Sequence, residues 1–172
     1  MSRERKRHFI EELKRHYAEL IASARDAEVA AAEAAETLRL EAKRREDTKG
    51  AVEFGRIAGA HKDRRERARR ELETLIAFAA GGLASLPRSA KIRVGALVDV
   101  SIDDAGATEE RTFFVLPVGA GSELTGPGGD GFITVVTPES PVGRGLVGAC
   151  VGDSFETSIG GRDREWTIVD VC

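Results

Sequence analysis

The chain has 172 residues, of which 41% are hydrophobic and 32% are charged, and its formal net charge at neutral pH is −3. This length suits one ordinary domain or two small ones. No apolar run approaches the roughly 18 residues that a membrane-spanning helix needs. The charged N-terminus is interrupted by Glu4 and lacks the apolar stretch of a signal peptide. Cys150 and Cys172 have no C-x-x-C spacing. We therefore expect a soluble, cytoplasmic protein with reduced thiols and no membrane partner.

Charge and composition change near residues 85–90. Up to Ala90 there are 20 Lys and Arg against 16 Asp and Glu, and beyond it 6 against 13, so a net charge of +4 is followed by one of −7. The second half is also richer in Gly, Val and Thr. We predict two domains, one over residues 1–84 and one over residues 90–172.

Apolar and small residues recur at a helical spacing through the first part of the chain. Between Leu20 and Leu38 the steps are 4, 3, 4, 3 and 4, which is the heptad spacing of a coiled coil. Alanine at most of these positions buries little surface, but it lets a partner helix approach closely. The predicted seam consists of Phe9, Leu13, Tyr17, Leu20, Ala24, Ala27, Ala31, Ala34 and Leu38.

The segment Glu46–Gly50 interrupts this helical pattern and carries two adjacent acids. Asp47 and Thr48 can cap a following helix, and Gly50 tolerates the backbone angles of a tight reversal. A second seam follows and ends before Gly81-Gly82, which stops a helix. Because the connection is too short for a parallel return, we predict an antiparallel coiled-coil hairpin with an acidic tip near residues 46–50. The second seam consists of Phe54, Ile57, His61, Arg64, Ala68, Leu72, Leu75 and Ala79.

Dense positive charge lies on both sides of the tip, and two interpretations are open. Such residues usually form a solvated helix face with pairs one turn apart, such as Glu66 with Arg70. They would otherwise face phosphates or an acidic protein channel. The residues concerned are Lys43, Arg44, Arg45, Lys62, Arg64, Arg65, Arg67, Arg69 and Arg70.

Beyond residue 90 the pattern changes to that of β-strands. The glycine-rich segment 119–131 is predicted to be a loop. Ser140 can cap a short helix that begins at Pro141 and ends at Gly148. Four or five antiparallel strands with this helix on one face give an α+β fold, with the helical hairpin at the N-terminus. Extended segments are predicted at residues 91–100, 111–116, 132–136, 151–157 and 165–171.

The segment 137–153 resembles the C-terminal FKBP-like domain of the GreA/GreB transcript cleavage factors, which are transcription elongation factors. In that family the corresponding element reads S-P-[IL]-[AG]-R-[AG]-L-[IL]-G and is followed shortly by V-G-D. The closing strand 165–171 and the preceding hairpin fit the same family in order and length. The matching residues are Ser140, Pro141, Gly143, Arg144, Gly145, Leu146, Gly148, Val151, Gly152 and Asp153.

The resemblance implies that the hairpin enters the secondary channel of bacterial RNA polymerase, near the nascent RNA 3′ end. The family's tip is similar to D-L-[SK]-E-N-A-E-Y, and the nearest register here is D-T-K-G-A-V-E-F, from Asp47. Asp47 keeps the first acid, Gly50 replaces the second, and Glu46 would substitute for it. Asp47 and Glu46 are thus the implied catalytic and metal-binding residues, supplying oxygen ligands to Mg²⁺ shared with the polymerase active site. Alternatively, both are ordinary capping or solvated residues.

The resemblance also implies that the short helix is the polymerase-binding element. Ser140 and Pro141 would begin it, Arg144 would pair with the channel rim, and Leu146 and Val147 would be apolar contacts. Alternatively, Leu146 and Val147 are core residues of the helix.

Three functions remain open at this point. The chain is a cleavage-stimulating factor, a secondary-channel regulator of the same shape without cleavage, or a coiled-coil protein with another partner. In none of them do we expect the chain to be an enzyme by itself, because the first two modulate the polymerase's own activity. The free protein is not expected to bind a cofactor tightly.

Overall fold

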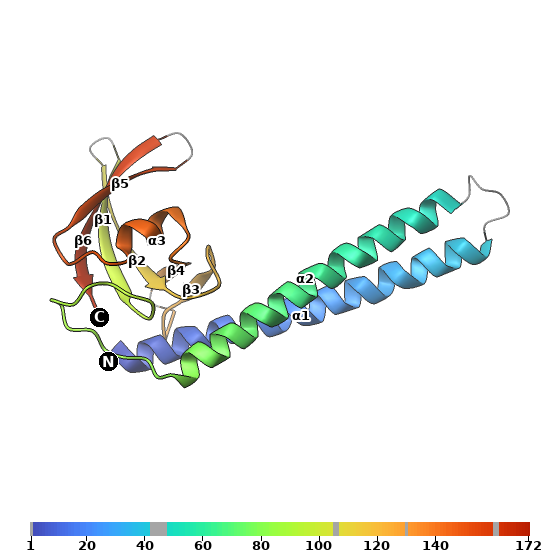
Figure 1. Ribbon diagram of the computed structural model, residues 1–172, viewed down its shortest axis with the longest axis horizontal. Helices are drawn as coiled ribbons and strands as arrows, with labels where there is room; N and C mark the ends of the chain where they lie inside the picture. Colours follow the sequence, from blue (N-terminus) through green and yellow to red (C-terminus); the bar gives the residue numbers. More distant parts are fainter. Residues whose placement is uncertain (1, 42–47, 105–106, 130, 160–161) are drawn as a thin grey trace. The chain divides into compact units, whose positions relative to one another are not determined.

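The computed structural model describes residues 2–41, 48–104, 107–129, 131–159 and 162–172 (Figure 1). Its compact units are Lys14–Glu73, here called the hairpin unit, and Met1–Leu13 with Thr74–Cys172, here called the sheet unit. The predicted domain boundaries, 1–84 and 90–172, stay a prediction. The elements are α1 (Ser2–Glu41), α2 (Thr48–Ala80), β1 (Leu97–Asp104), β2 (Ala107–Val115), β3 (Glu123–Thr125), β4 (Phe132–Val136), α3 (Pro141–Leu146), β5 (Ser154–Ile159) and β6 (Arg162–Val171).

The hairpin unit consists of two helices that run antiparallel and side by side (Figure 1). The Tyr17 hydroxyl donates a hydrogen bond of 2.7 Å to Glu71 Oε2. Farther along α1, Glu28 Oε2 lies 3.1 Å from Arg65 Nε. Residue numbers rise along α1 while those of the partners fall along α2, so the predicted antiparallel hairpin is confirmed.

Alanine dominates the buried face of the hairpin unit. Tyr17, Ala24 and Ala31 are 7% exposed or less, so the predicted seam of α1 is confirmed at these positions. Near the end of α1 the buried position is Ala35 rather than Ala34. A straight helix drifts relative to a strict seven-residue repeat, which accounts for this shift of one residue.

The predicted seam of α2 is wrong in its first half. Phe54 and Ile57 are 38% and 37% exposed, and Arg64 is exposed too. Ala51, at 5% exposure, and the partly buried Arg65 take the inward positions instead. The prediction followed the larger apolar side chains, whereas small residues occupy the face that comes closest to α1.

The sheet unit contains a six-stranded sheet in the order β3-β4-β2-β1-β6-β5. All neighbouring pairs are antiparallel except β2 with β4, which are parallel. The sheet is therefore mixed, where an antiparallel one was predicted. The chain returns from β2 to β4 through the predicted glycine-rich loop, and this long connection is what a parallel pair requires. The loop also contains β3, which the sequence did not reveal.

The first strand begins later than its sequence indicated. The predicted strand starts at residue 91, but β1 starts at Leu97 because Gly95 interrupts the extended backbone. Gly95 has a φ of +96°, and its N–H donates to Val115 O at 2.7 Å. Glycine adopts this backbone conformation without the penalty that a side chain brings.

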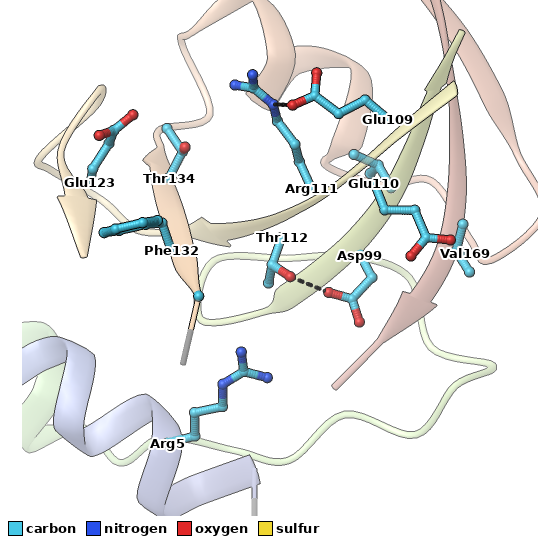
Figure 2. Close-up of a pocket in the computed structure, with 12 residues that line it drawn as sticks. Arg5, Asp99, Glu109, Glu110, Arg111, Thr112, Glu123, Phe132, Thr134 and Val169 are labelled. Carbon is cyan, nitrogen blue, oxygen red and sulfur yellow. Dashed lines mark hydrogen bonds and ion pairs between the residues drawn. The ribbon is translucent and has the colours of Figure 1, made fainter. Parts of the chain in front are cut away.

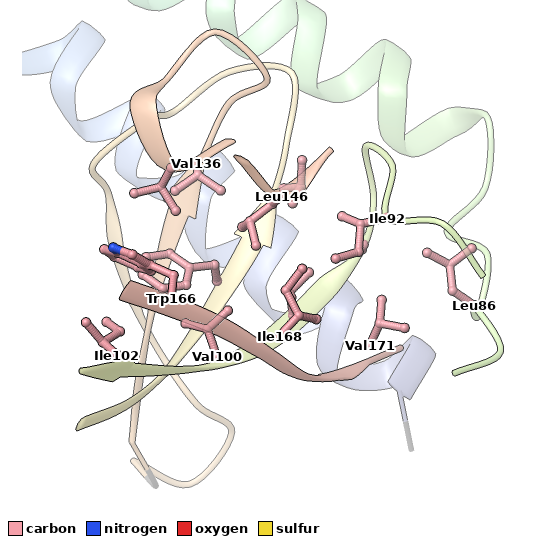
Figure 3. Packing of buried hydrophobic residues seen from close by; sticks show 14 residues of the cluster. Leu86, Ile92, Val100, Ile102, Val136, Leu146, Trp166, Ile168 and Val171 are labelled. Atoms are coloured by element: carbon pink, nitrogen blue, oxygen red, sulfur yellow. The ribbon is translucent and has the colours of Figure 1, made fainter. Parts of the chain in front are cut away.

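Helix α3 packs against one face of the sheet, as predicted, and Figure 3 shows its Leu146 among the buried side chains of the strands. Val142 and Leu146 of α3 join a cluster of buried side chains from β1, β2, β4 and β6. Within it, the Trp166 ring lies 5.6 Å from the Phe113 ring and 5.9 Å from the Phe155 ring. These aromatic contacts link β2, β5 and β6 within the core.

The first turns of α1 also pack within the sheet unit. Phe9 is fully buried, and its ring lies 6.2 Å from that of Phe114. Lys6 is also fully buried, and its Nζ donates to the backbone oxygen of Ala84 at 2.9 Å. No helix among the described residues is long and apolar enough to cross a membrane. Cys150 and Cys172 are both free.

Candidate functional site

The predicted tip residues Glu46 and Asp47 lie outside the described residues. The described part of α1 ends at Glu41, and α2 begins at Thr48. The catalytic and metal-binding assignments of the two acids therefore stay predictions. Within the described part of the chain, no group of three or more His, Cys, Asp or Glu side chains could hold a metal ion.

The sequence suggested that Gly50 forms part of the chain reversal, and this prediction is wrong. Gly50 lies in the first turn of α2, and its φ is not in the left-handed region. A Cβ atom placed on Gly50 would lie 3.1 Å from Leu38 Cδ1 of α1. The glycine thus serves close packing between the two helices, directly beside the tip.

The predicted cap of α3 is present. Ser140 has an extended backbone with φ −67° and ψ 154°, and its Oγ accepts a hydrogen bond of 3.0 Å from Gly143 N. The same hydroxyl donates to Thr137 O at 2.8 Å. Pro141 occupies the first helical position, where its missing N–H costs nothing. These bonds hold the short helix at a fixed place after β4.

Two glycines of the element are required by its packing. A Cβ atom on Gly143 would overlap the backbone oxygen of Thr137. A Cβ atom on Gly145 would overlap the ring of Phe155, which stacks on Trp166. The spacing of these glycines is therefore a consequence of how closely α3 approaches the preceding turn and β5.

The structure separates the predicted polymerase-binding residues into two groups. Pro141 and Arg144 are exposed, and Val147 is 39% exposed, so all three present surface to a partner. Leu146 is fully buried in the sheet core, so its assignment as a surface contact is wrong. The sequence did not predict the burial of Leu146, because either face of so short a helix can turn toward the core.

These features define a class of protein: an antiparallel helical hairpin with a mixed six-stranded sheet and one capped helix. No known protein family profile matches the chain. No curated protein matches it either.

Several solved structures are similar to the chain. GreA factor homolog 1 (Gfh1) of Thermus thermophilus is 17% identical, with 92% of this chain and 94% of that chain covered and a TM-score of 0.36. Gfh1 of Thermus aquaticus is 15% identical, with 91% and 92% covered and a TM-score of 0.36. A GreA/GreB elongation factor from Nitrosomonas europaea is 20% identical, with 50% and 63% covered and a TM-score of 0.35. The resemblance to the GreA/GreB family is thus found again among solved structures; at these scores it assigns no function.

Proposed function

We propose that the chain is a transcription elongation factor of the GreA/GreB type that binds bacterial RNA polymerase. In this proposal the hairpin unit enters the secondary channel and modulates the active site, while the sheet unit holds the channel rim. The observation that carries the proposal is the α3 element. Its family-like sequence places glycine at positions 143 and 145, where a side chain would overlap neighbouring atoms. It also leaves Arg144 and Val147 exposed for a partner.

The length of the hairpin unit suits this role. Residues 14–41 of α1 would span roughly 40 Å at about 1.5 Å per residue. The alanine-rich seam keeps the paired helices narrow, because small side chains let the two backbones approach closely. Part of the surface charge is paired locally, as in Glu53 with Arg56 and Arg69 with Glu73. These pairs follow the solvated-face interpretation rather than a phosphate-binding one.

The residues that would act at the polymerase active site are Asp47 and Glu46. Mg²⁺ prefers carboxylate oxygens and keeps several waters, so one acid at the tip fits an ion that the polymerase already holds in part. When bound, this ion would help clamp the attacking and leaving oxygens during RNA hydrolysis. The chain's own contribution is to bring a carboxylate to that ion and to hold it there.

Two assays test the proposal. Core RNA polymerase should co-elute with the full chain, and a failure to bind would favour a coiled-coil protein with another partner. A backtracked polymerase complex with Mg²⁺ should then release a short 3′ RNA product when the chain is added. Asp47→Ala should abolish this product without weakening polymerase binding. Equal cleavage by the variant would remove Asp47 from the mechanism.

A second candidate function is regulation of the polymerase without cleavage. Its specific support is Gly50, which stands where the family has a second acid and packs against Leu38. An acidic side chain at this position would press against Leu38 Cδ1, which would have to shift to admit it. Co-elution with polymerase without any 3′ RNA product would select this second function.

A further inference from the structure

Strand β2 leaves part of one edge without a partner strand among the described residues. Strand β2 pairs with β1 from Ala107, opposite Asp104, to Phe114, opposite Leu97. On its other side, the pairing with β4 begins only at Thr112. The stretch from Thr108 to Arg111 therefore has backbone groups that point away from β1 and meet no described strand. Free edges of this kind accept an additional extended chain.

A cavity of about 670 Å³ adjoins this free edge. Figure 2 shows Phe132 and Glu123 at one side of it and the Arg111–Glu109 pair at another. Phe132 is the first residue of β4 and is 73% exposed, which is unusual for a phenylalanine in a sheet. The sequence predicted Phe132 as an ordinary strand residue and gave no sign of this exposure.

The charges around the cavity favour a cationic occupant. Two cations also line the cavity, Arg5 and Arg111, and both are already engaged. The Arg5 guanidinium lies 5.7 Å from the centroid of the Phe9 ring, and Arg111 Nε lies 2.8 Å from Glu109 Oε1. Glu110 and Glu123 are exposed and have no ion-pair partner within the described ranges. Asp99 accepts a hydrogen bond of 2.6 Å from the Thr112 hydroxyl, which is neutral. The residues after Ala90 carry a net charge of −7, so the cavity lies in an acidic part of the chain.

We propose that the free edge of β2 and its adjoining cavity bind an extended, arginine- or lysine-bearing segment of a partner protein. The segment's backbone pairs with the edge from Thr108 to Arg111. Its cationic side chains meet Glu110 and Glu123, and one of them lies over the exposed ring of Phe132. This proposal is independent of polymerase binding through α3.

A second copy of the chain fits this edge poorly. Edge-to-edge pairing of two β2 strands would bring Glu109 and Glu110 of each copy close to the acids of the other. Like charges at opposing positions destabilise a strand pair. The acids therefore discriminate against self-association while attracting a basic segment.

The test uses the full-length chain and a fluorescent peptide of alternating arginine and valine, with binding followed by fluorescence anisotropy. Glu110→Gln combined with Glu123→Gln should weaken binding about three- to ten-fold, given what exposed charge pairs contribute. Phe132→Ala should weaken it about two- to five-fold through loss of the cation–π contact. The matched control, Glu156→Gln with Glu165→Gln, removes two exposed acids from β5 and β6 and should change the affinity less than about two-fold.

A second probe separates strand addition from simple charge attraction. The same peptide with N-methylated valines keeps every arginine but cannot donate backbone hydrogen bonds at those positions, and it should bind clearly more weakly. Equal weakening by the control pair and the cavity pair, or equal binding of the N-methylated peptide, would overturn the proposal. If neither peptide binds, the proposal is wrong, and the acids instead serve to prevent other strands from pairing with the free edge.

Discussion

The substitution Gly143→Ala tests the geometry of the α3 element most sharply. Its methyl group would overlap Thr137 O and come 2.9 Å from Ser140 Oγ. Those two oxygens form the cap, so the turn must open to admit the methyl. Losing a helix cap costs about 1 kcal/mol, a second hydrogen bond about 1 kcal/mol, and overpacking about 1–3 kcal/mol. We expect the free energy of unfolding to fall by about 3 kcal/mol, the lower part of this range, because the turn can relax in part.

Urea unfolding measured by Trp166 fluorescence gives this value for the sheet unit alone. Trp166 is the only tryptophan of the chain and is buried beside α3. The matched control is Gly59→Ala on α2, where an added Cβ would meet no atom within 4 Å. Alanine is the better helix former, so this variant should stabilise α2 by about 1 kcal/mol, seen by far-ultraviolet circular dichroism. An unchanged urea midpoint for Gly143→Ala would refute the packing described for the element.

Three further outcomes are expected. The pKa of buried Lys6 is lowered, mainly by desolvation, so the unfolded chain binds the proton more readily than the folded chain. The free energy of unfolding of the wild type, measured in urea, should therefore rise relative to that of Lys6→Met as the pH rises toward 10.5. A difference between the two proteins that stays constant with pH would contradict the lowered pKa. The pKa of Tyr17 is raised, first by burial and then by its bond to Glu71, so the wild type should lose stability above pH 10. Tyr17→Phe should not lose stability above pH 10, and at neutral pH it should lower the free energy of helix unfolding by about 2 kcal/mol. An equal loss of stability above pH 10 in both proteins would contradict the raised pKa of Tyr17. Arg144→Glu should weaken polymerase binding without lowering the melting temperature, and unchanged affinity would remove Arg144 from the interface.

Local chemistry explains what the sequence predicted well. Ser140, Pro141 and the glycines after them act within one turn, so their roles could be read from spacing alone. Strand β4 was predicted with its observed bounds, since its apolar run has clear ends. The antiparallel hairpin followed from two helical patterns and a short connection.

Nonlocal geometry explains what the sequence could not predict. The parallel pairing of β2 with β4 depends on a crossover, and strand propensity contains no information about it. The inward face of α2 depends on how closely α1 approaches, so Ala51 is buried while the larger Phe54 is partly exposed. The free edge of β2 likewise exists only because β4 begins at Phe132, partway along its neighbour.

The central claim is that the hairpin delivers its tip to the polymerase active site, and site-specific crosslinking tests it most directly. A photoreactive group would be attached at Lys49→Cys, in the first turn of α2, after Cys150 and Cys172 are replaced by serine. In a backtracked polymerase complex, this position should crosslink to the nascent RNA 3′ end or to polymerase residues around it. The same group at the exposed Lys62, farther along α2, should not. Equal crosslinking from both positions, or none from Lys49→Cys in a complex that contains the chain, would contradict the account.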